Sequence, residues 1–219
     1  MSAASAGMPG RLVRRGRCHV FGDDIPLDDG LIPFEMAIRR IDDPAQLCPE
    51  LLRLIDPAFP ERVRPGDIVV AGANFGCGKP HFQGFIAMAA LGVSVVCASM
   101  PYKTLRGAIS KGVPVLTGWP IAGGPGGGGF LADGLASEGA MPHGPMAQGR
   151  KAEGSGTVAG VRTGDVLEVD FAAGTVSGPG LAATVQLPPL SPLLVDIVRS
   201  GGMRGMLATW LREHPHMGE

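Results

Sequence analysis

Residues 66–80 read GDIVVAGANFGCGKP, and this stretch decides the fold. The turn at Arg64–Asp67 leads into Ile68–Gly72, a short and continuously apolar run. A strand that is buried on both faces of a parallel sheet has this pattern. Gly76 and Gly78 then allow positive φ angles and close backbone approach, and Pro80 suits the first position of a helix. The stretch therefore predicts a buried strand, a glycine-rich turn and a helix in succession.

The residues that follow complete a βαβ unit. The predicted helix runs through Phe82, Phe85 and Ile86 to Gly92, and Val93–Ala98 is a second buried strand. We expect the two strands to be parallel, with a right-handed crossover. The turn then lies at the carboxyl end of a strand and the amino end of a helix, where α/β sheets bind anions and carboxylates. Neither a P-loop nor a G-x-G-x-x-G motif is present, so nucleotide binding is not favoured.

The rest of the chain is predicted to add further short elements to this α/β core. Asp43 and Pro44 are typical of a helix start. The expected strands are 17–25, 112–116, 161–171 and a hairpin return at 174–176; the expected helices are 44–56, 101–110, 192–199 and an amphipathic tail helix at 203–211.

We predict one domain over residues 1–219. Residues 1–13 are expected to be a disordered N-terminus, and 119–160 a flexible insert, because 13 of the 35 glycines fall within 121–160. Residues 161–219 would complete the same domain. The basic N-terminus either leads directly into the first strand or resembles an organellar transit peptide.

Composition excludes several classes of function. The formal net charge is −1, which gives no electrostatic case for nucleic-acid or membrane-surface binding. No apolar run reaches the length of a membrane span. The four cysteines form no C-x-x-C pair, so no zinc ribbon or self-contained iron–sulfur motif is present. With 45% hydrophobic residues a disulfide framework is not needed, and we expect a reducing, cytoplasmic setting.

The segment 66–78, ending in Asn74-Phe75-Gly76-Cys77-Gly78, resembles the small subunit of 3-isopropylmalate dehydratase, the free-standing swivel domain of the aconitase superfamily. Other landmarks occur in the same order. They are Phe21–Ile25 through Ile32-Pro33, Leu91–Ala98, Gly112–Val115, Gly164-Asp165 with Val169-Asp170, and Gly201–Met203. The resemblance covers residues 14–118 and 161–212 and implies a β/β/α three-layer fold with a parallel core sheet.

The sequence departs from this family where the family places its chemistry. After the Gly-Cys of the turn the family continues Gly-Ser-Ser-Arg-Glu-His, with a serine base and an arginine that holds a carboxylate. Residues 78–83 read GKPHFQ instead. Lysine holds a carboxylate only as a point charge, while Lys79 or His81 has the chemistry of a base. Tyr102 and Gly107 stand where the family has an arginine and an asparagine, with Lys103 and Arg106 nearby.

Acidic residues cluster at 23–29, and two interpretations remain open. Asp23, Asp24, Asp28 and Asp29 either stabilise turns through their own backbone or form a polar edge that faces a ligand. The family has a Thr-Asp pair here. Asp28 or Asp29 takes the aspartate position, depending on where a one-residue insertion is placed, and no threonine is present.

The resemblance implies a small subunit of a heteromeric hydro-lyase, a dehydratase or isomerase of a hydroxy-carboxylic acid, with altered specificity. The partner would be a large subunit that carries a [4Fe–4S] cluster, in a heterodimer or heterotetramer, and this chain would bind no metal. The candidate catalytic residues are Lys79 and His81; the candidate substrate-binding residues are Asn74, Gly76, Cys77, Gly78, Asp28 and Asp29. Two alternatives remain, a non-catalytic assembly subunit of the same fold and a stand-alone small-molecule binding domain.

Overall fold

A computed structural model describes residues 11–120, 157–158 and 160–215. Its sheet has seven strands in the order β4-β3-β2-β1-β7-β8-β9. The parallel half comprises β1 (Val13–Val20), β2 (Ile68–Ala71), β3 (Ser94–Cys97) and β4 (Val115–Thr117). Val69 lies opposite Val95 in the parallel register, which confirms the predicted βαβ core.

The antiparallel half comprises β7 (Val166–Asp170), β8 (Thr175–Ser177) and β9 (Val185–Gln186). Strand β1 joins the two halves, because its residues 13–17 pair with β7 and its residues 18–20 pair with β2. A separate two-stranded ribbon is formed by β5 (Thr157–Val158) and β6 (Val161–Arg162).

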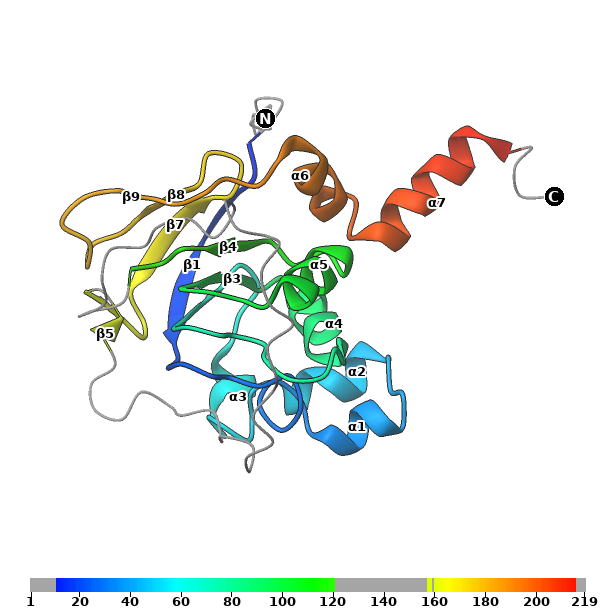
Figure 1. Cartoon of the computed structure of the whole chain (residues 1–219), viewed down its shortest axis with the longest axis horizontal. Coiled ribbons are helices and arrows are strands. Elements are labelled where there is room, and N and C mark those ends of the chain that lie inside the picture. The colour runs from blue at the N-terminus through cyan, green and yellow to red at the C-terminus, as the bar shows by residue number, and fades with distance from the viewer. Residues whose placement is uncertain (1–10, 121–156, 159, 216–219) are drawn as a thin grey trace, which may run out of the picture.

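Two apolar clusters lie on opposite faces of the parallel strands. Val69 and Val95 belong to the cluster on the helical side, while Val70 and Val96 belong to one that includes Val169 of β7. Successive residues of a strand face opposite sides, so strands buried on both faces need the continuous apolar runs seen in the sequence. The antiparallel half covers one face and helices cover the other, so the fold has the β/β/α layers that the resemblance implied (Figure 1).

The helices are short. They are α1 (Phe34–Ile38), α2 (Pro44–Leu47), the 3-10 helix η1 (Cys48–Glu50), α3 (Phe59–Arg62), α4 (Gln83–Ala90), α5 (Tyr102–Ser110), α6 (Pro192–Arg199) and α7 (Met203–Glu213). Helix α7 extends away from the body of the molecule and buries none of its residues (Figure 1). Within the described residues, no helix has both the length and the apolarity needed to cross a bilayer.

The prediction of one helix over 44–56 is wrong. Asp43 does cap the start, since its carboxylate accepts a hydrogen bond from the amide of Ala45, and Pro44 is the first helical residue. The helix nevertheless ends at Leu47, because Pro49 has no N–H to donate and its ring obstructs the carbonyl of residue 45. Leu52 then takes a φ of 55°, which no regular helix contains.

The predicted boundaries of the irregular segments also need correction. Leu12 is buried and β1 begins at Val13, so the predicted disordered N-terminus does not extend to residue 13. At the start of the predicted insert, Trp119 is buried and its amide donates a hydrogen bond to the carbonyl of Cys97. Near its end β5 pairs with β6. Residues 1–10, 121–156 and 159 lie outside the described part of the chain.

Arg11 and Asp170 connect the start of β1 to the end of β7. Burial raises the pKa of Asp170. The hydrogen bonds from Arg11 and from the amides of Ala172 and Ala173 lower it by more, so the pKa of Asp170 lies below the ordinary value of 3.8. A lowered pKa adds stability that is present above the unfolded-state value and is lost as the pH falls through the folded-state value.

We expect Asp170→Asn to lower the free energy of unfolding by about 1–2 kcal/mol near neutral pH. The difference from wild type should shrink as the pH falls below about 4. Urea unfolding across this pH range measures it, with Asp196→Asn on the exposed face of α6 as the control. A deficit of constant size at every pH would contradict the assignment.

Candidate active site

The loops that follow β1 and β2 meet at the carboxyl edge of the parallel strands. Pro26 and Cys77 form a parallel bridge, and the amide of Leu27 donates to the carbonyl of Cys77 at 2.9 Å. The amide of Gly76 donates to the carbonyl of Ile25 at 2.7 Å. These backbone bonds place the glycine-rich turn directly beside the acidic loop, as expected for loops after neighbouring parallel strands.

The turn at residues 74–78 has an unusual backbone in which Asn74, Gly76 and Gly78 all have positive φ, at 58°, 74° and 96°. Gly76 is required for space as well, since a Cβ there would lie 2.5 Å from the methyl group of Thr104. The Thr104 hydroxyl donates to the Gly76 carbonyl at 2.8 Å, which attaches the turn to α5. No sequence pattern indicates this contact.

The carboxylates at the start of the acidic loop support the turn. Asp23 accepts from the amide of Ala73 at 2.6 Å, and Asp24 accepts from the side-chain amide of Asn74 at 2.8 Å. The amide of Asn74 donates to the hydroxyl of Ser99, which follows β3. These two aspartates therefore stabilise a turn, but the turn belongs to another loop and not, as one interpretation predicted, to their own backbone.

Asp28 and His81 form a side-chain pair at this edge. The ring Nδ1 of His81 lies 2.8 and 2.9 Å from the two carboxylate oxygens of Asp28. Asp28 is 6% exposed, while the side chain of His81 retains 35% exposure. The ring of Phe34 lies 5.9 Å from the imidazole, centroid to centroid. A buried carboxylate thus orients an accessible imidazole, the arrangement that activates histidine in many enzymes.

Asp29 makes a different contact from Asp28. It is exposed, its φ is 59°, and its carboxylate accepts from the amide of Phe34 at the start of α1. Asp29 therefore stabilises the loop-to-helix junction, and Asp28 is the carboxylate that reaches the turn.

The prediction that Pro80 opens the helix is wrong, and this changes the position of Lys79. Helix α4 begins at Gln83, and Phe82 precedes it with a non-helical backbone. Lys79 is therefore four residues before the helix, and it is exposed without an ion pair to any described residue. The backbone therefore does not place Lys79 at the helix amino terminus, where the two were expected to bind one anion together.

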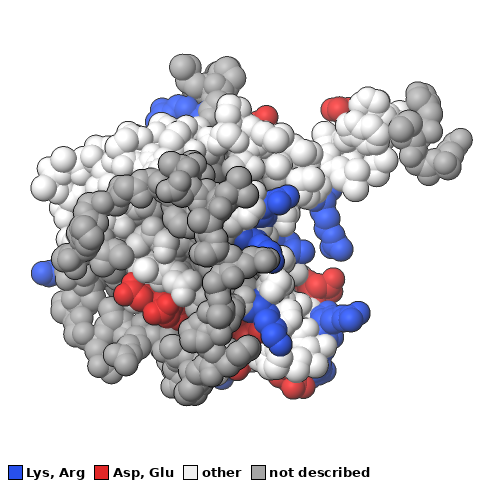
Figure 2. All heavy atoms as spheres, in the orientation of Figure 1, with Lys and Arg blue, Asp and Glu red and all other residues white. Residues whose placement is uncertain are grey.

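Phe82 and Gly107 fit together. A Cβ at residue 107 would lie 2.3 Å from the ring of Phe82. The ring thus occupies the space into which any side chain at position 107 would project. Nearby, the guanidinium of Arg106 lies 5.7 Å over the exposed ring of Tyr102. Basic and acidic side chains are interspersed on the side of the described chain that carries α5 and α1 (Figure 2).

The four cysteines are free thiols, and burial changes their acidity. Burial raises the pKa of Cys97 to about 12 and that of Cys18 to about 11, so both stay protonated thiols. Burial, and next the charge of Asp24, raise the pKa of Cys77. No three His, Cys, Asp or Glu side chains among the described residues are grouped to hold a metal ion.

The comparisons with known proteins agree with this architecture. No family model matches the chain. Over 190 residues it is 32% identical to the 3-isopropylmalate dehydratase small subunit of Pyrobaculum calidifontis, covering 86% of this chain and 93% of the relative. The chain belongs to the family of 3-isopropylmalate dehydratase small subunits.

Two further relatives and one solved structure are also similar to the chain. The small subunit of Moorella thermoacetica is 27% identical over 90% of this chain and 96% of its own length. The methanogen homoaconitase small subunit of Methanocaldococcus jannaschii is 38% identical over 48% of this chain and 61% of its own. A crystal structure of 3-isopropylmalate dehydratase from Methanocaldococcus jannaschii shares the fold with a TM-score of 0.67. It is 24% identical and covers 94% of this chain and 99% of that one.

The residues of the glycine-rich turn that were expected to bind substrate differ in what they contact. Of the predicted substrate-binding residues, Gly76 and Cys77 both direct their amides to the carbonyl of Ile25, so their backbone holds the turn together. Gly78 is exposed and a Cβ there would meet no atom within 4 Å, so open space adjoins it. A ligand that approaches the turn has room at Gly78.

Proposed function

We propose that this chain is the small subunit of a heteromeric dehydratase that adds water to, or removes it from, a hydroxy-carboxylic acid. The pair Asp28–His81 carries the proposal, because it supplies a base on the turn where the family places its serine. The relatives' names support a large-subunit partner, since each is called a small subunit. The [4Fe–4S] cluster would belong to that partner and would act as a Lewis acid on the hydroxyl group.

The contacts to Asp28 indicate which nitrogen of His81 would act as the base. An ionised carboxylate only accepts hydrogen bonds, so the short contacts to Asp28 put a proton on Nδ1 of His81. The lone pair is then on Nε2. In dehydration Nε2 takes a proton from the carbon next to the one that loses hydroxide, and the electron pair of that C–H bond forms the double bond. Asp28 stabilises the imidazolium, and hydration returns the proton.

Substrate carboxylates need cations at this edge. Lys79 precedes His81 by two residues, and Lys103 and Arg106 are exposed on α5. Because a lysine offers a point charge rather than a planar fork, it constrains a carboxylate's orientation less than arginine does. This difference supports an altered substrate preference within the family. Gly78 would give the substrate access to the turn.

Reconstitution with the large subunit from the same genome tests the proposal. The two full-length chains are co-expressed and purified without oxygen, and formation of the carbon–carbon double bond is followed by absorbance. The substrates offered are 3-isopropylmalate and the substrate of the homoaconitase relative. Turnover of either acid that requires both chains supports the dehydratase. A stable complex that turns over neither these acids nor a panel of other hydroxy-carboxylic acids identifies a non-catalytic assembly subunit, and failure to form a complex overturns the proposal.

Lys79→Ala should raise KM about 10- to 100-fold with little change in kcat, if Lys79 holds a substrate carboxylate through a charge-assisted hydrogen bond. Steady-state kinetics of the reconstituted enzyme measure this. Lys111→Ala, at the end of α5, is the matched control. A fall in kcat alone would make Lys79 the base, and unchanged kinetics would remove it from the site.

A further inference from the structure

A separate site with a basic lining lies at the amino end of β2, whereas His81 follows the carboxyl end of that strand. It is a pocket of about 270 Å³ lined by Arg17, His19, Glu61, Arg62, Arg64 and Gly164. Arg17 and His19 are alternate residues of β1 and so face the same side of the sheet. The ring of Phe59 in α3 lies edge-on to the ring of His19, 5.0 Å away, so α3 adjoins the pocket.

Asp67 holds three residues of the pocket lining in place through hydrogen bonds. It is 4% exposed, and its carboxylate accepts from the amides of Arg17 at 3.1 Å and Arg64 at 2.9 Å. A further bond joins it to Nε2 of His19 at 2.9 Å. One buried carboxylate therefore holds the backbone of two arginines and the ring of a histidine in place. These three hydrogen bonds already stabilise its negative charge.

The lining is basic and contains an unsatisfied polar atom. Three arginines face one acid, Glu61, among the lining residues. Arg62 is paired with Asp56, while Arg64 uses only Nη1, in bonds to the carbonyls of Glu61 and Val63. His19 is 5% exposed, and its Nδ1 has no hydrogen-bond partner within the described chain. Because Nε2 is bonded to Asp67, Nδ1 becomes a donor for an anion only when the ring is doubly protonated.

We propose that this pocket binds a small anion carrying carboxylate or phosphate oxygens. Guanidinium groups on a fixed backbone suit both groups, because their N–H donors match pairs of oxygens. The volume exceeds the ~30 Å³ share of a single water several-fold, which leaves room for a dicarboxylate or a phosphate. The site is independent of the proposed dehydratase chemistry, because none of its residues belongs to the Asp28–His81 edge.

The test compares two probes on the full chain by isothermal titration calorimetry at constant ionic strength: inorganic phosphate and malonate. Arg17→Gln/Arg64→Gln removes both side-chain charges and keeps the amides that bond to Asp67. Arg39→Gln/Arg204→Gln removes two exposed charges, one at the residue after α1 and one on α7, and is the matched control. A second readout is the ¹⁵N resonance of His19 Nδ1 during each titration.

We expect saturable binding of at least one probe, weakened about tenfold or more in Arg17→Gln/Arg64→Gln and unchanged in the control, with a shift of the His19 resonance. Binding of phosphate alone, or of malonate alone, assigns the type of anion. Equal affinity in the wild type and Arg17→Gln/Arg64→Gln would overturn the proposal. So would the absence of saturation with both probes. Circular dichroism of each variant excludes misfolding as the cause of any loss.

Discussion

Replacing His81 with glutamine should lower kcat of the reconstituted enzyme by about 10²–10⁴ and leave KM nearly unchanged. Glutamine keeps a hydrogen-bond donor toward Asp28 but has no basic nitrogen to accept the proton. Steady-state kinetics with purified complexes measure the loss. His214→Gln is the matched control, because His214 stacks on Trp210 in α7, outside the site. Wild-type turnover in His81→Gln would exclude the imidazole as the base.

Asp28→Asn separates orientation from proton transfer. An amide at position 28 still reaches Nδ1 but carries no charge to stabilise the imidazolium. We expect a smaller fall in kcat than for His81→Gln, with KM nearly unchanged. A merely structural role for Asp28 would lower the free energy of unfolding without lowering kcat of the folded enzyme. The pair of variants therefore assigns His81 as the catalytic residue and Asp28 as the positioning residue.

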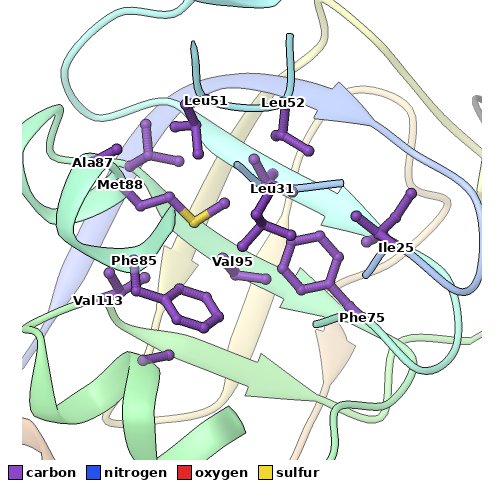
Figure 3. Packing of buried hydrophobic residues seen from close by; sticks show 14 of the residues in the cluster. Ile25, Leu31, Leu51, Leu52, Phe75, Phe85, Ala87, Met88, Val95 and Val113 are labelled. Carbon is purple, nitrogen blue, oxygen red and sulfur yellow. The ribbon is translucent and has the colours of Figure 1, made fainter. Parts of the chain in front are cut away.

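Phe75→Ala should lower the free energy of unfolding by about 3–5 kcal/mol, the usual cost of emptying a buried phenylalanine site. Phe75 is fully buried although it lies in the site turn, between Asn74 and Gly76. Figure 3 shows its ring pointing into the helical-side cluster, near Leu31 and Val95. The alanine would leave a cavity beneath the turn that the surrounding strands cannot close.

Urea denaturation of the full chain measures the effect of Phe75→Ala. Phe75→Leu refills part of the space and should cost clearly less, while Leu54→Ala, at a side chain that is 57% exposed, should change stability by less than about 0.5 kcal/mol. Equal losses for Phe75→Ala and Leu54→Ala would show that the turn is not anchored by this ring.

The core was predictable because its signal is local. Ile68–Ala71 and Ser94–Cys97 are short apolar runs separated by one helix length, and their parallel pairing follows from the helix that connects them. The placement of the site at the carboxyl edge follows from the same topology, since both loops leave neighbouring parallel strands.

The details of the site were not predictable because they depend on tertiary contacts. Asp28 and His81 are 53 positions apart, and no periodicity relates them. Phe82 has φ −99° and ψ 15°, so the helix starts after it rather than at Pro80. Its ring packs over Gly107 on α5, a contact that local propensity does not contain. In the same way, Thr104 holds Gly76 across 28 positions.

The contact between Phe82 and Gly107 has a consequence for recombination between family members. A relative with a side chain at the position of Gly107 presents a Cβ where this chain places the ring of Phe82. A crossover between residues 82 and 107 would combine Phe82 with a side chain at position 107, and the two cannot occupy the same space. Chimeras joined before residue 82 or after residue 107 inherit the matched pair, so the natural unit of exchange spans α4, β3 and the first part of α5.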